Sequence, residues 1–266
     1  MKQLLSKKNR ALVAELVRTD FKLRYQGSVL GYAWSLLRPL LMFVILYIVF
    51  VKFLKIGDEV PHFPVYLLLG IVVWNFFTEM TQQSLTSVVA RGDLIRKIKI
   101  PRWIIVISSS LSAVINMGLT MMVITIFMVV NKVDVSREIL AVPLILLQVY
   151  IFSLGMSFFL SAAFVKYRDI SYIWEVILQA GFYATPILYP ISIIQNEMAQ
   201  KVLFMNPMAQ TIQGIRYAMV TQETVTIWKV FDGGWYSFIP IILTGVIFVF
   251  GVWYFRRESK YFAENI

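Results

Sequence analysis

Long apolar runs separated by short polar stretches dominate this sequence. Six runs approach or exceed the length of about 20 residues that a helix needs to cross a bilayer. They are Leu36 to Phe53, Val65 to Leu85, Trp103 to Val130, Val142 to Val165, Tyr172 to Tyr189 and Phe238 to Phe255. The strands of an outer-membrane barrel would instead be about ten residues long with strict alternation. The pattern predicts an all-α polytopic membrane protein with six transmembrane helices, forming a single domain over residues 1–266.

The first 35 residues have a different pattern and predict a helix at the membrane surface. Between Leu12 and Leu23, apolar residues fall on one broad side of a helical wheel and charged ones on the other, as in helices that lie in a membrane interface. Asp20 and Arg24 are exceptions, because they fall within the apolar side, four residues apart, where they can pair with each other. A helix that only lies on lipid has little use for such a pair. We therefore expect this helix to face a protein partner.

The connection from Ala90 to Arg102 predicts a short helix between the second and third spans. Gly92 and Asp93 can cap this helix, and Pro101 ends it. Its residues are basic and half apolar: Leu94, Ile95, Arg96, Lys97 and Ile98. Such a helix suits a groove on a soluble partner, and it equally suits an anchor on the membrane surface. The loop alone does not separate these two interpretations.

The long connection from Thr185 to Ser237 is apolar yet interrupted by Pro186, Pro190 and Pro207. Its apolar pieces, of which the longest runs from Met208 to Val220, are too short to span a bilayer. Segments of this kind dip into the membrane or lie along it, buried against protein. We expect short re-entrant or gate helices between the fifth and sixth spans, over residues 186–236. The alternative is an external cap without a gating role.

Charge fixes the expected orientation. Only 15% of the residues are charged, against about 25% in soluble domains. Of the 25 Lys and Arg residues, 18 fall in the N-terminal segment, the loops after the second and fourth spans, and the C-terminal tail. Basic residues gather on the cytoplasmic side of membrane proteins, so both termini are expected to be cytoplasmic, in the cytoplasmic (inner) membrane. The net charge of +10 follows from this topology and gives no reason to invoke nucleic acid.

Several spans contain polar residues. Glu79 lies in the second span, where a carboxylate is costly unless it faces a partner or water. Glu175, Gln179 and Tyr183 repeat every four residues on the fifth span, which favours a pathway or a subunit surface. Serines at similar spacing on the third and fourth spans favour helix packing.

The sequence contains no recognisable catalytic machinery. Cysteine is absent, and the single histidine, His62, is expected to be a solvated loop residue. No GxxxxGK[ST] phosphate loop and no nucleophile elbow occurs. We therefore expect neither catalytic residues, nor a metal site, nor a cofactor bound by this chain, and we do not expect an enzyme. If the protein transports actively, its energy comes from an ion gradient or from a partner.

An ordered set of motifs resembles a known family over nearly the whole chain. The N-terminal residues concerned are Arg18, Asp20, Lys22, Arg24, Tyr25, Ser28, Leu30, Gly31, Trp34 and Pro39. LIRKIKIPR in the loop at 90–102, KYRDI at Lys166 to Ile170, TPILYP at Thr185 to Pro190, and Asn206-Pro207 follow in order. This set is similar to the membrane subunit of type-2 ATP-binding-cassette exporters of lipid-linked surface polysaccharides, namely the O-antigen, capsule and teichoic-acid exporters.

The resemblance implies a homodimer bound to two copies of a separate ATPase subunit, which carries the ATP and magnesium. An undecaprenyl-diphosphate-linked glycan would pass between the protomers. Coupling to the ATPase would involve an interface helix at Leu16 to Tyr25 and a coupling helix at Asp93 to Lys99, including Asp20, Arg24, Asp93, Leu94, Ile95, Arg96 and Ile98. Candidate residues for the diphosphate or the channel are Arg24, Arg38, Tyr47, Asn116, Glu175, Gln179 and Tyr183. Candidate residues of the external gate are Pro186, Tyr189, Pro190, Pro207 and Arg216.

Alternatives remain open for several of these expectations. Arg24 and Arg38 equally suit simple anchoring at the inner face of the membrane. A type-2 permease for a drug or another lipid would share the six spans, although such permeases usually lack the N-terminal pattern. An ion-coupled secondary transporter should show internal repeats and intramembrane charge pairs, and no convincing repeat occurs. A membrane-embedded transferase would need a surface cluster of acidic or histidine residues, which is absent.

Overall fold

A computed structural model describes residues 7–24, 27–31, 33–55, 60–97, 100–134 and 136–265. Within these ranges every regular element is helical. The helices are α1 (Lys7–Arg24), α2 (Ala33–Leu46), α3 (Phe63–Ala90), α4 (Gly92–Lys97), α5 (Trp103–Val130), α6 (Val142–Lys166), α7 (Ile170–Ala184), α8 (Glu197–Phe204), α9 (Pro207–Met219), α10 (Ile227–Val230), α11 (Ile239–Glu258) and α12 (Phe262–Asn265). Short π or 3-10 helices are η1 (Tyr47–Phe53), η2 (Arg137–Ala141), η3 (Ile191–Ile193), η4 (Trp235–Phe238) and η5 (Ser259–Tyr261).

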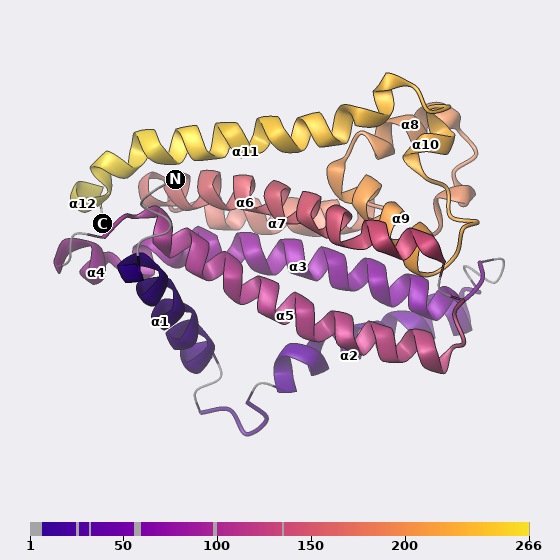
Figure 1. Ribbon diagram of the computed structural model, residues 1–266, viewed down its shortest axis with the longest axis horizontal. Coiled ribbons are helices and arrows are strands. Elements are labelled where there is room, and N and C mark those ends of the chain that lie inside the picture. The colour runs from indigo at the N-terminus through magenta and orange to yellow at the C-terminus, as the bar shows by residue number, and fades with distance from the viewer. Residues whose placement is uncertain are drawn as a thin grey trace.

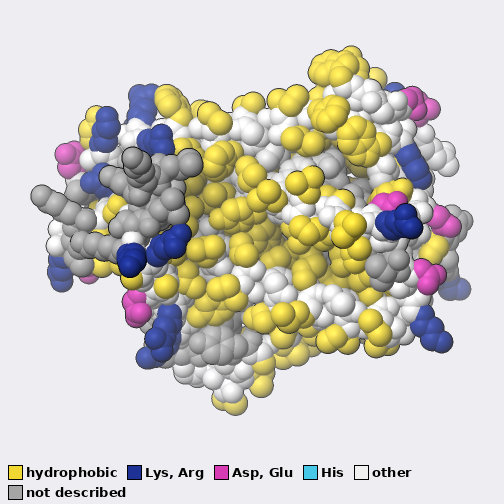
Figure 2. Space-filling model, in the orientation of Figure 1, with side chains coloured by type: hydrophobic (Ala, Val, Ile, Leu, Met, Phe, Trp, Pro, Cys, Tyr) yellow, Lys and Arg dark blue, Asp and Glu magenta, His cyan; other side chains and the backbone are white. Residues whose placement is uncertain are grey.

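The predicted membrane fold is confirmed in its main features. In the described part of the chain, five helices are long and apolar enough to cross a membrane: Ala33–Phe53, Phe63–Ala90, Trp103–Val130, Arg137–Lys166 and Trp235–Tyr261. Each contains one of the predicted runs. Hydrophobic side chains cover the middle of the molecule, whereas charged side chains gather at its two ends (Figure 2). This distribution is the one that a bilayer around the middle requires.

The fifth predicted run does not form a full span. It was expected from Tyr172 to Tyr189, but α7 is 15 residues long and ends at Ala184. The cause is local, because Thr185 precedes Pro186 and takes an extended backbone with ψ 139°. A residue before proline is disfavoured in the helical region. The segment that follows α7 is a buried turn rather than a helix, with Thr185, Ile187 and Leu188 all inaccessible.

Helix α3 is the centre of the bundle. It packs against α5 on one side and α6 on the other, and α9 and α7 also contact it (Figure 1). Its residues Val65 to Val73 are all buried, whichever way they point, so the helix is apolar on every side. A helix that is hydrophobic all round belongs to the core of a bundle. The remaining spans are arranged around it, and α2 and α11 are largely uncovered.

Small residues allow the closest helix contact, between α6 and α11. A Cβ atom added to Gly155 would lie 2.6 Å from the Cα of Phe248, and one added to Gly251 would overlap the carbonyl oxygen of Gly155. Serine contributes in the same way, since Ser157 on α6 is buried and its hydroxyl donates to the carbonyl of Met80 on α3, at 3.3 Å. The packing interpretation of the serine stripe on this span is therefore confirmed.

The two ends of the bundle differ in structure. One end holds α4, α12 and the C-terminal end of α11, while the other end holds α8, α9 and α10 (Figure 1). Helix α1 packs against the first half of α5, with a hollow of about 580 Å³ between them that Val13, Val17, Ile107 and Leu111 help to line. The predicted N-terminal helix is thus present, and its apolar side lies against α5 of the same chain.

Candidate functional site

The predicted helix in the connection at 90–102 is present as α4. Asp93 is in its first turn, and Arg96 and Lys97 are exposed in its last turn. Leu94 and Ile95 are half-buried, and Ile95 packs on the core cluster. The apolar side of α4 is therefore only partly available to a partner. Ile98, which was expected to continue this side, lies outside the described residues.

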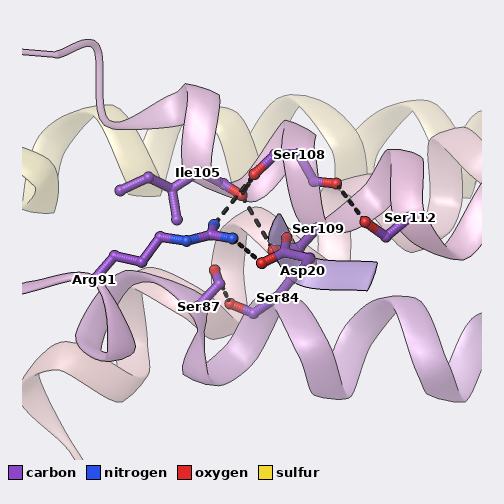
Figure 3. A network of polar contacts seen from close by, with 8 residues as sticks. All are labelled: Asp20, Ser84, Ser87, Arg91, Ile105, Ser108, Ser109 and Ser112. Atoms are coloured by element: carbon purple, nitrogen blue, oxygen red, sulfur yellow. Dashed lines mark hydrogen bonds and ion pairs between the residues drawn. The ribbon is translucent and has the colours of Figure 1, made fainter. Parts of the chain in front are cut away.

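An ion pair joins α1 to the start of α4. The guanidinium of Arg91, between α3 and α4, contacts the carboxylate of Asp20 on α1 and also donates to the hydroxyl of Ser108 on α5, at 3.2 Å (Figure 3). The side chains of Arg91 and Asp20 are 16% and 27% exposed. A partly buried pair of this kind is screened less by salt than a surface pair.

The structure gives Asp20 a partner that the sequence did not suggest. The i, i+4 spacing suggested Arg24, whose side chain is outside what the structure describes, but the carboxylate of Asp20 pairs with Arg91, 71 positions away along the chain. Helix α1 lies across the beginning of α5, so the part of α1 that carries Asp20 meets the junction of α3 and α4. Sequence spacing reports only neighbours on one helix and could not identify this contact.

Four of the five serine hydroxyls around this ion pair donate within their own helices, and the fifth, that of Ser84, is buried without a partner. Ser108 donates to the carbonyl of Ile105 at 2.8 Å, Ser109 shares that carbonyl, and Ser112 donates to the carbonyl of Ser108 (Figure 3). Ser87 bonds to Ser84 in the same way on α3. Because the Ser108 hydroxyl already donates its proton to the Ile105 carbonyl, its oxygen is free to accept from Arg91. The Asp20–Arg91–Ser108 contact therefore links α1, the α3–α4 junction and α5.

A second contact holds the end of the 90–102 connection that leads into α5. Arg102, at the start of α5, donates to the backbone carbonyl of Ser259, beyond the end of α11. Helix α12 also contacts α4, and the ring of Phe262 is buried against Phe255 at a centroid distance of 5.4 Å. The connection that carries α4 is thus in contact with both the N-terminal helix α1 and the C-terminal helix α12.

A cavity with a partly polar lining, called the polar cavity below, lies between three candidate membrane-spanning helices, α2, α3 and α5. Its volume is about 360 Å³, and two of the expected channel residues, Arg38 and Asn116, line it together with Glu79. Asn116 donates an N–H to the Oε1 atom of Glu79, and Gln83 donates to the same atom at 2.7 Å. The carboxylate is costly in the bilayer on its own, and these donors compensate for part of that cost.

The other expected channel residues lie elsewhere. Tyr47 is in η1, with its ring 5.8 Å from that of Phe43. Glu175, Gln179 and Tyr183 are exposed along α7, and Tyr183 is 69% exposed. Their stripe is therefore available to a second subunit, to lipid or to a pathway between subunits, and it does not line the polar cavity.

At the opposite end of the bundle from α4, Arg216 is completely buried in α9. Its guanidinium donates to three backbone carbonyls: Tyr66 at 3.0 Å, Pro186 at 2.6 Å and Ile187 at 2.6 Å. It also stacks on the ring of Tyr66, 3.7 Å from the centroid. Gly70 leaves the room for this group, because a Cβ atom there would overlap the guanidinium. Arg216 therefore ties α9, α3 and the turn after α7 together.

The other residues expected at this end surround the same point. Pro186 and Pro190 are buried in the turn after α7, and Pro207 is buried in the first turn of α9 behind an Asn206 side-chain cap. The hydroxyl of Tyr189 donates to the carbonyl of Tyr183 at 3.4 Å. The structure thus brings all five expected gate residues into one region, and it adds Tyr66 and Gly70, which sequence reasoning missed.

The fold defines a multi-pass α-helical membrane protein. The chain belongs to the ABC-2 type transporter family, whose family model matches residues 11–220. This family comprises transport membrane subunits, which work in the membrane with a separate ATPase.

Named relatives extend the comparison over nearly the full length. Two proteins of Klebsiella pneumoniae, both named O-antigen export system permease protein RfbA, are 30% and 29% identical to this chain. Each match covers 95% of this chain and 94% of the relative. A protein of the same name from Myxococcus xanthus is 28% identical over 75% of this chain and 76% of its own length.

Proposed function

We propose that this chain is the membrane-spanning subunit of an ATP-driven exporter that moves undecaprenyl-diphosphate-linked polysaccharide across the cytoplasmic membrane. The observation that carries the proposal is the similarity, over 95% of the chain, to two proteins named as O-antigen export permeases. Two features support the proposal: the polar cavity beside α2, which would face the substrate, and the Asp20–Arg91 contact between α1 and the α3–α4 junction, which would serve coupling.

The partner ATPase would bind at the end of the bundle that carries α1, α4 and α12. Asp93, Leu94, Ile95 and Arg96 would contact it from α4, and ATP and Mg²⁺ would be held by the partner. In this arrangement Asp20 acts through Arg91 and positions α1 against α4, so that the two helices move together. The basic character of that end supports the proposal that it faces the cytoplasm, with both termini on this side.

Two copies of the chain would form the exporter. The proposal is supported by the uncovered helices α2 and α7, which expose large apolar side chains such as Leu41, Ile45, Tyr172 and Val176. The sixth membrane crossing would be made by α7 together with the buried turn that follows it. Irregular backbone is tolerated at membrane depth where protein covers it, and Thr185, Ile187 and Leu188 meet this condition.

The external gate would be formed by the turn after α7 and by α8 and α9. Arg216 supports this proposal because its three carbonyl contacts join the turn to α9 and to the central helix α3. A guanidinium held only by carbonyls keeps its positive charge without an acidic partner. Arg38, at the inner part of α2, and Arg24, whose side chain is not described, remain the candidates for the diphosphate.

Deleting the gene in its source organism and restoring it from a plasmid would test this function. The proposal predicts that surface polysaccharide disappears in the deletion strain while lipid-linked glycan accumulates inside the cell. Restoring the wild-type chain should reverse both changes. Unchanged surface polysaccharide in the deletion strain, together with export of a drug or another lipid by the restored chain, would instead identify a different type-2 permease.

A further inference from the structure

A basic pocket lies where α6 and α11 end, apart from the polar cavity and from the turn after α7. Its volume is about 350 Å³, and it is lined by Lys166, Arg257, Glu258, Lys260 and Tyr261. Lys166 is the last residue of α6, Arg257 and Glu258 are the last two of α11, and Lys260 and Tyr261 belong to η5. Both helices are part of candidate membrane spans. The basic pocket therefore lies between two spans, at the level where they leave the membrane.

The lining of the basic pocket has an excess of positive charge. Its three cations are accompanied by one carboxylate, that of Glu258, which lies 3.6 Å from the guanidinium of Arg257. Among the residues that the structure describes, neither Lys166 nor Lys260 forms an ion pair, and both are exposed. Phosphate groups are recognised by charge-assisted hydrogen bonds from Lys and Arg side chains. The pocket is therefore suited to a group that carries phosphate and a net negative charge.

An exposed apolar face of α11 leads directly to the basic pocket. Val246, Phe250, Trp253 and Arg257 recur at helical spacing, so they fall on one face, and the three apolar side chains are exposed. The guanidinium of Arg257 lies over the indole of Trp253, 5.7 Å from the ring centroid, and the indole packs on Phe250 at 5.9 Å. Tryptophan is enriched at the level of lipid headgroups. This face of α11 thus has the character of a surface in contact with lipid, and it ends in cations.

The pocket and the apolar face together favour an anionic phospholipid as the ligand. A soluble phosphate would use the cations and leave the apolar face of α11 uncovered. A zwitterionic lipid balances its phosphate with its own ammonium group, so it would not neutralise the excess charge of the lining. Basic pockets between membrane-spanning helices on the cytoplasmic side bind anionic headgroups. Lys and Arg side chains gather at the end of the bundle where α11 finishes (Figure 2), and we expect this end to face the cytoplasm.

We propose that the basic pocket binds the headgroup of an anionic phospholipid, with Lys166, Arg257 and Lys260 contacting the phosphate and one acyl chain lying along Trp253 and Phe250. A lipid bound there would join the ends of α6 and α11, close to α12, which contacts α6 and α4. The inference goes beyond the proposed function and does not depend on which substrate is transported.

The test measures the binding of the first lipid molecule to the full-length chain in a non-ionic detergent, by native mass spectrometry. Two lipids with identical acyl chains are compared, namely phosphatidylglycerol, which is anionic, and phosphatidylcholine, which is zwitterionic. The measured quantity is the ratio of their dissociation constants. Because no bilayer is present, the general attraction of a basic protein to a charged membrane surface does not contribute. The wild type should bind phosphatidylglycerol about tenfold more tightly.

Lys166→Gln and Lys260→Gln each remove an exposed cation that forms no ion pair, so both variants should fold normally. Each should lower the preference for phosphatidylglycerol by about twofold to fivefold, the effect of one exposed charge pair, and the double variant should nearly abolish it. Arg256→Gln is the matched control. Arg256 is an exposed cation in the same last turn of α11 but does not line the pocket, so its replacement should leave the ratio unchanged.

Three results would overturn the lipid site. The first is a wild type that binds both lipids equally, and the second is an unchanged ratio in Lys166→Gln, Lys260→Gln and their double variant. The third is an equal loss in Arg256→Gln, which would assign the preference to overall charge. Equal lipid binding by the wild type, together with weaker ATPase binding by Lys260→Gln, would assign the pocket to an acidic surface of the ATPase. The assay contains no glycan and no ATP, so its result is independent of whether the proposed export function holds.

Discussion

Removing the ion pair between Asp20 and Arg91 should weaken the hold of α1 on α4. In Asp20→Asn or Arg91→Gln, the carboxylate or the guanidinium is left without its charged partner. Pairs on a protein surface contribute about 0–1 kcal/mol, whereas breaking a buried pair costs about 3–5 kcal/mol. With exposed fractions of 27% and 16%, this pair should lie between the two limits, at about 1–2 kcal/mol.

The consequence should appear in ATPase binding. Without the pair, α1 is no longer held against the α3–α4 junction before the ATPase docks. Ordering the two then costs free energy during docking, so the binding free energy should weaken by about the contribution of the pair. A loss of about 1–2 kcal/mol corresponds to a dissociation constant raised by a factor of about 5–30. Titration of labelled ATPase onto the permease in nanodiscs measures this constant directly. Glu15→Gln on α1 is the control, because it removes an exposed carboxylate from the same helix.

A double-mutant cycle makes this prediction specific to the pair. If Asp20 and Arg91 act through each other, the double variant should bind the ATPase about as well as either single variant. Exchanging the two charges, with Asp20→Arg and Arg91→Asp together, should recover part of the loss. Strictly additive losses in the double variant, or single variants that bind like Glu15→Gln, would refute the role assigned to the pair.

Three further changes test other parts of the structure. Arg216→Lys should lower the thermal transition of the purified protein by about 6–12 °C, because a lysine cannot reach three carbonyls at once; an unchanged transition would contradict the role of Arg216 as a link. Gly251→Ala should destabilise the packing of α6 on α11 by about 1–3 kcal/mol in a denaturation assay, whereas Gly245→Ala, which meets open space, should have no effect. Arg96→Glu, at an exposed position of α4, should reduce ATPase co-purification while leaving the permease folded by size-exclusion chromatography, and normal co-purification would argue against docking at α4.

Sequence periodicity located the elements that depend on local composition. Four of the spans begin and end within a few residues of their apolar runs, because a bilayer demands both length and hydrophobicity. The helix at Gly92–Lys97 was also predictable, since its cap and its terminating proline lie close along the chain. The predicted fifth span, 172–189, was longer than the helix that forms. The prediction followed the apolar composition and did not take into account that Pro186 ends the helical backbone before the turn.

Contacts between distant segments could not be derived from the sequence. Asp20 had an available partner four residues away, and its contact with Arg91 arises only because α1 crosses the start of α5. Similarly, Glu79 and Asn116 were both noticed as polar residues within spans, but their meeting depends on the register between α3 and α5. Arg216 was singled out as a charge in an apolar segment, yet three carbonyl groups from two distant segments, α3 and the turn after α7, hold it.

The central claim is that this subunit, with its ATPase, moves a lipid-linked glycan across a membrane. The most direct measurement uses proteoliposomes containing both subunits and undecaprenyl diphosphate that carries a labelled glycan, with ATP added on the side of α4. A membrane-impermeant glycosidase on that side then reports how much glycan remains accessible. The account predicts that ATP progressively protects the glycan from the enzyme and that a non-hydrolysable ATP analogue does not. Glycan that stays fully accessible during sustained ATP hydrolysis by the assembled complex would contradict it.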